Sequence, residues 1–205
     1  MADILYTMTS KAIRSALRIA FFTIVSSPLV QAQSEATPAA AGPKLDYEYQ
    51  FLNKDSTEGI EKSYRNGKLY AEIYFKNKGQ FQFVKRYDAT TGKLLQSDTV
   101  INFNKMVGSS ITYFPTGSIK EIQHHDSSGK VDLYQGYFEN GHKKVSIAYR
   151  NGKRNGLFTE YHPTGKMKET GRYVNDKREG VFRFYDARGT LILTKKFKQD
   201  VVVKK

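Results

Sequence analysis

Ring-bearing and small residues return at a fixed spacing of 24 residues in the second half of the chain. A tyrosine and, four positions later, a glycine recur together, and a second ring recurs halfway between successive tyrosines. The basic unit is therefore one strand and one turn in about 12 residues. The repeat-defining residues are Tyr113, Tyr137, Tyr161 and Tyr185 with Gly117, Gly141, Gly165 and Gly189, and the intervening rings are His125, Tyr149, Tyr173 and Phe197.

Turn-forming residues stand where these strands should end. Asn140-Gly141 and Asn151-Gly152 predict tight hairpin turns, because Asn and Gly adopt positive φ at low cost. Pro115-Thr116-Gly117 predicts a turn in which Pro fixes φ and Gly closes the loop. No segment after residue 43 keeps apolar residues at helical spacing for three turns. We therefore predict an all-β fold, an antiparallel sheet of tandem hairpins of about 24 residues each.

Two details of the repeat leave alternatives open. A second glycine column runs through Gly108, Gly156 and Gly180 but is broken by Asp132. Phe158 and Tyr161 differ in parity along their predicted strand, so in a regular strand they face opposite sides of the sheet. Either both faces of the sheet are partly covered, or a bulge interrupts the alternation.

The same unit recurs at uneven spacing before the regular repeats. Its traces are Tyr64–Leu69, Tyr74–Gly79 and Tyr87–Leu94. Terminal repeats of such arrays are often atypical because they cap the stack. We therefore predict one repeat domain over residues 44–205, with irregular repeats at 44–107 and regular repeats at 108–200. Residues 33–43 are rich in Ala and Pro and predict a disordered tether.

Residues 1–32 have the composition of a signal peptide. Basic residues precede a short apolar run, Ile19–Val25, and small residues precede a cleavage position after Ala32. The run is shorter than the roughly 20 residues that span a bilayer, and an uncleaved anchor or interfacial helix is the alternative. We expect a helical leader and an exported protein, periplasmic or secreted.

Positive charge is concentrated in the regular repeats. The chain carries a formal net charge of +13, and residues 140–205 hold 17 basic and 6 acidic side chains. The period aligns the basic residues into columns, which are Lys120, Lys144 and Lys168, then Lys153 and Lys177, then Arg154 and Arg178. They are either solvated charges that protect turns and edges, or a docking surface for an acidic protein, an anionic lipid or a cell-envelope polymer. The predicted export disfavours nucleic acid as the partner.

Candidate catalytic chemistry is sparse. The chain has no cysteine and only four histidines, which lack the spacing of a metal site. Carboxylates are scattered, and no nucleophile elbow, phosphate loop or dinucleotide motif occurs. We therefore predict no catalytic residues, no metal, no cofactor and no enzymatic activity. A hydrolase of envelope polymers is the remaining enzymatic alternative, and it would need a deep acidic pocket.

The segment Gly156–Glu179, GLFTEYHPTGKMKETGRYVNDKRE, resembles the bacterial variant of the MORN repeat and is similar to the YwqK-type antitoxin family. The likeness extends over Tyr113–Asp200. Lys143 departs from the pattern where an apolar residue is usual, and Phe158 and Phe182 replace its usual Trp. The resemblance implies an elongated antiparallel sheet that serves binding or scaffolding and not catalysis. It also implies an alternative role as an antitoxin or immunity protein.

Overall fold

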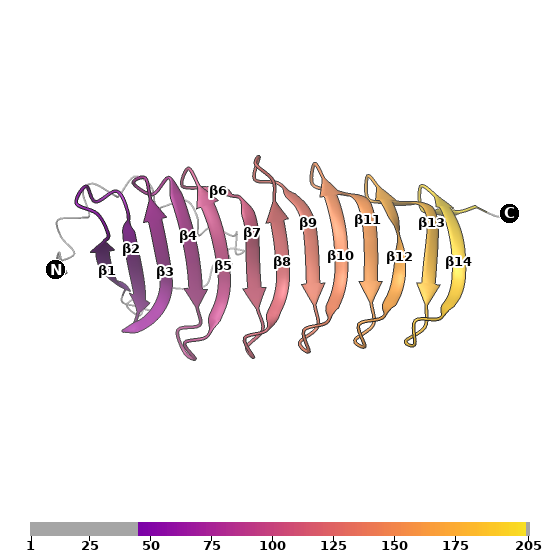
Figure 1. Ribbon diagram of the computed structural model, residues 1–205, viewed down its shortest axis with the longest axis horizontal. Coiled ribbons are helices and arrows are strands. Elements are labelled where there is room, and N and C mark those ends of the chain that lie inside the picture. The colour runs from indigo at the N-terminus through magenta and orange to yellow at the C-terminus, as the bar shows by residue number, and fades with distance from the viewer. Residues whose placement is uncertain (1–44, 204–205) are drawn as a thin grey trace, which may run out of the picture. The chain divides into compact units, whose positions relative to one another are not determined.

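The computed structural model describes residues 45–203, and every regular element in this range is a β-strand (Figure 1). The predicted leader, residues 1–32, and the tether, residues 33–43, lie outside the described residues. The strands are β1 Leu45–Phe51, β2 Gly59–Arg65, β3 Lys68–Lys76, β4 Phe81–Tyr87, β5 Leu94–Ile101, β6 Lys105–Met106, β7 Gly108–Tyr113, β8 Ile119–His125, β9 Val131–Tyr137, β10 Lys143–Arg150, β11 Lys153–Tyr161, β12 Met167–Val174, β13 Lys177–Tyr185, β14 Leu191–Lys198 and β15 Val201–Val202.

The strands fall into two compact units. Unit 1 holds the described residues up to Leu94 together with Val100–Lys105, and unit 2 holds Leu95–Thr99 and the residues from Met106 onward. Within unit 1, strands β1 to β4 pair antiparallel in chain order. Within unit 2, β5 pairs with β7, and β7 to β15 follow in chain order, again antiparallel. The predicted all-β fold of successive antiparallel hairpins is confirmed.

The four repeat-defining tyrosines occupy equivalent positions in unit 2, each as the last residue of β7, β9, β11 or β13. The turn that follows each one has a constant hydrogen-bond pattern. The first turn residue donates its N–H to the carbonyl four residues later, and the glycine donates to the carbonyl of the first turn residue. The glycines have φ values of +91° at Gly117, +85° at Gly141, +83° at Gly165 and +90° at Gly189. This left-handed conformation is the reason for the glycine column.

At the opposite strand ends, tighter turns join the later hairpins. Asn151-Gly152 forms the predicted two-residue turn, with φ of +52° and +75°. The next such turns are Asn175-Asp176 and Gln199-Asp200, where non-glycine residues hold positive φ throughout. Asn140-Gly141, predicted as a tight hairpin signal, instead lies in the longer turn after Tyr137, and only Gly141 has positive φ. From β9 onward, long and short turns therefore alternate along the chain, whereas the turn between β8 and β9 has the long pattern as well.

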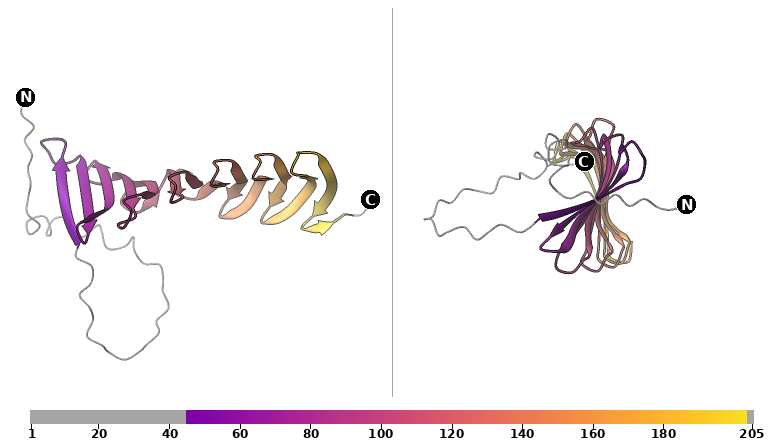
Figure 2. Two further views of the ribbon diagram at one scale, coloured as in Figure 1. Left: turned by 90° about the horizontal axis from the view of Figure 1, so that it is seen from below. Right: turned by 90° about the vertical axis from the view of Figure 1, so that its left-hand side faces the viewer.

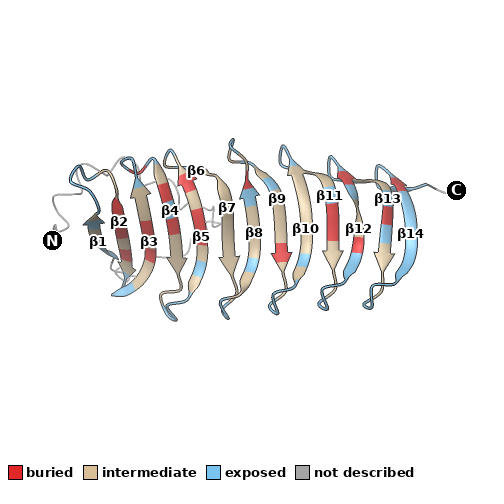
Figure 3. Cartoon of the chain, viewed as in Figure 1, coloured by how far each residue is buried: buried red, intermediate tan, exposed pale blue. Residues whose placement is uncertain are grey.

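One face of β11–β14 carries the core of unit 2. Residues directly opposite one another on paired strands share a face, and the pairs Phe158↔Gly171, Gly156↔Tyr173 and Gly180↔Phe197 define this one. Its buried rings, Phe158, Tyr173, Phe182 and Phe197, make edge-on or tilted contacts with centroids 5.2–6.5 Å apart. We call this the aromatic face, and its buried positions are marked on β11, β12 and β13 in Figure 3. Figure 2 shows these strands as bowed ribbons.

The structure resolves the parity of Phe158 and Tyr161. The register shift beside Tyr161 lies in the partner strand, where Glu160 pairs with Glu169 and Tyr161 with Met167. Lys168 is therefore the extra residue of a bulge in β12, and β11 itself keeps its alternation. Phe158 lies buried on the aromatic face, while Tyr161 is half-buried on the other face. Both alternatives thus hold: a bulge is present, and both faces are partly covered.

Candidate binding surface

The column Lys120, Lys144 and Lys168 consists of bulged residues. Each is the unpaired residue of a register shift at the start of β8, β10 or β12, just after one of the long turns. All three are exposed. Lys168 Nζ lies 2.8 Å from Glu160 Oε1, and Lys144 Nζ lies 5.9 Å from the ring centre of Phe138. The period of the column therefore reflects a backbone irregularity that recurs in each hairpin.

The other basic columns lie at the opposite ends of the strands. Lys153 and Lys177 begin β11 and β13, directly after the short turns, and both are exposed. A strand of seven residues separates the two ends by roughly 20 Å. The seven predicted binding residues therefore do not form one surface. Lys120, Lys144 and Lys168 flank the long turns, while Lys153, Arg154, Lys177 and Arg178 flank the short ones.

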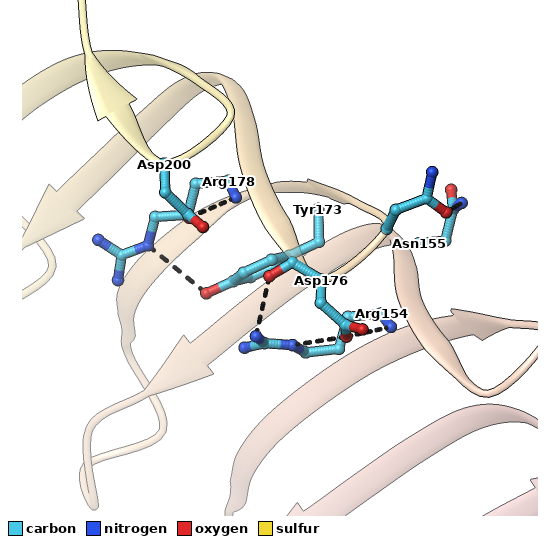
Figure 4. Close-up of polar contacts among 7 residues, drawn as sticks. Arg154, Asn155, Tyr173, Asp176, Arg178 and Asp200 are labelled. Atoms are coloured by element: carbon cyan, nitrogen blue, oxygen red, sulfur yellow. Dashed lines mark hydrogen bonds and ion pairs between the residues drawn. The ribbon is translucent and has the colours of Figure 1, made fainter.

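Arg154 is engaged within the sheet (Figure 4). Its backbone N–H donates to Asp176 Oδ1 at 2.8 Å, and Nη2 donates to the Asp176 carbonyl at 3.0 Å. Asp176 N–H donates in return to the Arg154 carbonyl at 3.0 Å. The guanidinium carbon lies 4.3 Å from the ring centre of Tyr173. Arg154 thus covers a ring of the aromatic face and ties neighbouring turns together, in an arrangement that we call the Arg–Asp latch.

The latch repeats 24 residues later. Arg178 N–H donates to Asp200 Oδ1 at 2.7 Å, and Asp200 N–H donates to the Arg178 carbonyl at 3.1 Å (Figure 4). The Arg178 guanidinium lies 5.2–5.3 Å from the ring centres of Phe182 and Phe197. Its Nη2 lies 3.1 Å from Glu169 Oε1, although burial still raises the pKa of the Glu169 carboxyl. Both arginines of this column therefore stabilise the aromatic face.

Replacing Asp176 with Asn should lower the free energy of unfolding at neutral pH. The backbone N–H of Arg154 lowers the pKa of the Asp176 carboxyl, and the Arg154 side chain adds to this effect. A lowered pKa in the folded state contributes stability above the unfolded-state pKa, and that stability is lost as pH falls through the folded-state pKa. The difference between wild type and Asp176→Asn, measured by urea denaturation, should therefore shrink below about pH 4. Asp55→Asn, in an exposed loop of unit 1, is the control, and an equal effect there would contradict the latch.

A third group of cations lies on the face opposite the aromatic rings. Arg172, Arg183 and Lys196 are exposed on the adjacent strands β12, β13 and β14. Their directly paired residues are Leu157, Thr170 and Val181, of which Leu157 and Val181 are 67% and 41% exposed. We call Leu157, Arg172, Val181, Arg183 and Lys196 the basic face. Leu157 and Val181 share one column of the repeat, and Arg172 and Lys196 share another. Only strand register shows that these two columns and Arg183 lie on the same face.

One carboxylate shares the basic face. Glu179 pairs directly with Arg172, and its Oε2 accepts the backbone N–H of Gln199 at 3.0 Å. Glu160 and Glu169 belong to the aromatic face instead, because they pair with Val145 and Phe184 there. The basic face therefore combines three exposed cations with exposed aliphatic groups.

The histidines serve the fold. His142 Nδ1 and Asn140 Nδ2 lie 2.8 and 3.0 Å from the Pro163 carbonyl, and His162 Nε2 lies 3.0 Å from the Tyr185 carbonyl. These contacts link the long turn after Tyr137 to the one after Tyr161, and that turn to the end of β13. His125 is buried in the ring column, opposite Gly108 on β7. Within residues 45–203, no three His, Asp or Glu side chains converge in a metal-binding group.

Residues 58–77 and 154–175 match the family model described as MORN repeat variant. The first segment spans β2 and β3, a hairpin with a two-residue turn. The second spans most of β11 and all of β12, a hairpin with a long turn. The match supports MORN-type repeats in this chain and does not extend to the antitoxin family. The part of the chain that is described contains no helix with the length and apolar character needed to cross a membrane.

No curated protein matches the chain. Among solved structures, the crystal structure of TarM is similar at 14% identity and a TM-score of 0.35, covering 49% of this chain and 19% of TarM. A mutant of S. aureus TarM in complex with Fondaparinux, alpha-GlcNAc-glycerol and UDP is similar at 12% identity and a TM-score of 0.36, covering 52% of this chain and 21% of that one. The chain thus spans about a fifth of the length of TarM.

Proposed function

We propose that this chain is an exported binding module that holds an anionic partner on the basic face of β11–β14. The observation that carries the proposal is the exposure of Arg172, Arg183 and Lys196 on adjacent strands, with the exposed Leu157 and Val181 beside them on the same face. Cations attract an anionic partner over a distance, and exposed aliphatic groups add contact area once it is bound. An acidic protein or an anionic polymer of the cell envelope has the complementary charge.

The remaining lysines would support this role from the strand ends. Lys120, Lys144, Lys153 and Lys177 are exposed and add to the positive field of unit 2. Arg154 and Arg178 are less suited to binding a partner, because their guanidinium groups already contact rings and carboxylates of the fold. A toxin neutralised by this chain would be one case of an acidic partner.

Export and the lack of catalysis are the less direct parts of the proposal. Export rests on the composition of residues 1–32, with basic residues, a short apolar run and small residues before Ala32. The non-catalytic role rests on the sparse chemistry of the sequence and on the repeat architecture. Repeat sheets of this kind present extended surfaces that suit binding.

The test measures binding to an immobilised polyglutamate, with dextran as the neutral control polymer. One variant replaces Arg172, Arg183 and Lys196 with Gln, and the matched variant replaces Lys120, Lys144 and Lys168 with Gln. Both lose the same charge, so a difference between them reports the location of the surface and not the net charge. We expect binding to polyglutamate to weaken about tenfold or more for the first variant and much less for the second.

Salt provides the second arm of this test. Raising the salt concentration shortens the Debye length to about 3 Å at 1 M, which should abolish most of the binding. Polyglutamate binding that survives high salt, or equal binding to dextran, would refute an electrostatic surface. Greater loss in the Lys120, Lys144 and Lys168 variant would move the surface to the bulged lysines and overturn the assignment to the basic face.

A further inference from the structure

An open hollow with a volume of about 450 Å³ lies on the aromatic side of unit 2, over β8, β9 and β10. Its lining residues are Gln123, Lys130, Val131, Tyr134, Tyr149, Asn151 and Gly152. The direct pairs Gln123↔Tyr134, Tyr134↔Ile147 and Ile147↔Phe158 connect its wall to the aromatic face. The hollow therefore lies on the opposite side of the sheet from the basic face, and its volume falls in the roughly 300–1,000 Å³ range of small-molecule sites.

The hollow exists because the Arg–Asp latch is missing from this repeat. Tyr149 stands 24 residues before Tyr173, Lys130 stands 24 before Arg154, and Gly152 stands 24 before Asp176. Gly152 has no side chain that could accept a hydrogen bond in the way that the Asp176 carboxylate does. The backbone N–H of Lys130 instead donates to Asp126 Oδ1 within its own turn, at 3.0 Å. Among residues 45–203, no cation lies over the ring of Tyr149 as Arg154 lies over Tyr173.

The broken glycine column explains the local change of register. Gly156 in β11 adopts φ of +132°. Near this glycine, Tyr149 of β10 pairs with Arg154 of β11. Asp132 takes the glycine position in β9, and His125 pairs with Val131 instead. The residue equivalent to the latch arginine, Lys130, is thereby left in the exposed turn at the rim of the hollow. Tyr134 and Tyr149 consequently line an open space and not a closed core.

The lining has the chemistry of a site for an acidic sugar. Two phenol rings offer flat apolar surfaces, and two primary amides, on Gln123 and Asn151, can each donate to and accept from hydroxyl groups. Lys130 adds an ammonium group, and none of the described residues that line the hollow carries a carboxylate. Burial, together with the neighbouring Glu121 carboxylate, raises the pKa of Tyr134 to about 12, so its phenol stays protonated at neutral pH.

We propose that this hollow binds a hexuronic acid unit of an acidic glycan, with the sugar ring against Tyr134 and Tyr149 and its carboxylate on Lys130. The ring of the sugar would take the place that the Arg154 guanidinium takes over Tyr173 in the next repeat. Gln123 and Asn151 would bond its hydroxyl groups. This inference goes beyond the proposed function, because it assigns a second site and a ligand class to the other face of the sheet.

The test titrates the full chain with an oligogalacturonate and with a neutral galactose oligosaccharide of the same length, by isothermal calorimetry. Lys130→Gln should weaken oligogalacturonate binding about tenfold, the scale of one charge-assisted hydrogen bond. Gly152→Asp should abolish binding by placing a carboxylate in the hollow. The fold should tolerate it, because Asp176 and Asp200 hold φ of +69° and +71° at the equivalent position, close to the +75° of Gly152. Circular dichroism checks that both variants fold.

Lys153→Gln is the matched control, since it removes one exposed cation beside the hollow without touching its lining. Equal losses for Lys130→Gln and Lys153→Gln, equal affinity for the neutral oligosaccharide, or no binding of oligogalacturonate would each overturn the inference. So would tighter binding of a nucleoside diphosphate. If oligogalacturonate binding is lost only in the Arg172, Arg183 and Lys196 variant, the hollow is excluded while the proposed function stands.

Discussion

Phe182→Ala is expected to lower the free energy of unfolding of unit 2 by about 3–5 kcal/mol, the usual cost of truncating a buried aromatic ring. Phe182 is fully buried and contacts the rings of Phe158, Tyr173 and Phe197 at centroid distances of 5.2–6.5 Å. The Arg178 guanidinium also lies over its ring. Within residues 45–203 no second layer covers β11–β14, and their buried hydrophobic side chains are the four rings of this row.

Val181→Ala is the matched control for Phe182→Ala. Val181 is adjacent in the same strand, but it points to the basic face and is 41% exposed. Its truncation should cost less than about 1 kcal/mol. Urea denaturation followed by far-ultraviolet circular dichroism gives both values. Similar losses for the two variants would mean that the aromatic face is not the core of unit 2.

The period of the sequence predicted the hairpins correctly because turn chemistry is local. Each long turn needs a glycine at a left-handed position, so its requirement is visible in a single residue column. The centre of the core was harder to predict. The tyrosine column that defines the repeat lies at strand ends and is half-buried, whereas Phe182 is completely buried. Both the tyrosine column and the position of Phe182 are visible in the sequence. Only the pairing of the strands shows that other rings surround Phe182 and not the tyrosines.

The candidate surfaces depended even more on register. The sequence aligned Arg154 with Arg178, yet the partners of these arginines are Asp176 and Asp200, which come from the next turn. A separation of 22 residues differs from the repeat length, so the period gives no hint of the pairing. The bulges at Lys120, Lys144 and Lys168 likewise depend on two strands together. The sequence therefore predicted that the basic residues form rows. It did not predict that these rows are divided between the two ends of the strands.

Gly171→Ala should destabilise unit 2 by about 1–3 kcal/mol, the usual cost of overpacking. Gly171 faces the Phe182 ring, and a Cβ atom there would lie 2.4–2.5 Å from three of its carbon atoms. The φ angle of Gly171 is not in the left-handed region, so the ring, and not the backbone, requires glycine at this position. The ring cannot move aside easily, because it is fully buried among its neighbours.

A double-mutant cycle separates this contact from a general effect on the strand. Phe182→Leu should be destabilising alone, but it vacates the space that the methyl group added by Gly171→Ala needs. The double variant should therefore lose less stability than the two single losses added together, with a coupling of about 0.5–3 kcal/mol. Gly171→Ala combined with Val181→Ala should be additive, since Val181 lies on the other face. Additivity in both cycles would show that the Phe182 ring does not set the requirement for Gly171.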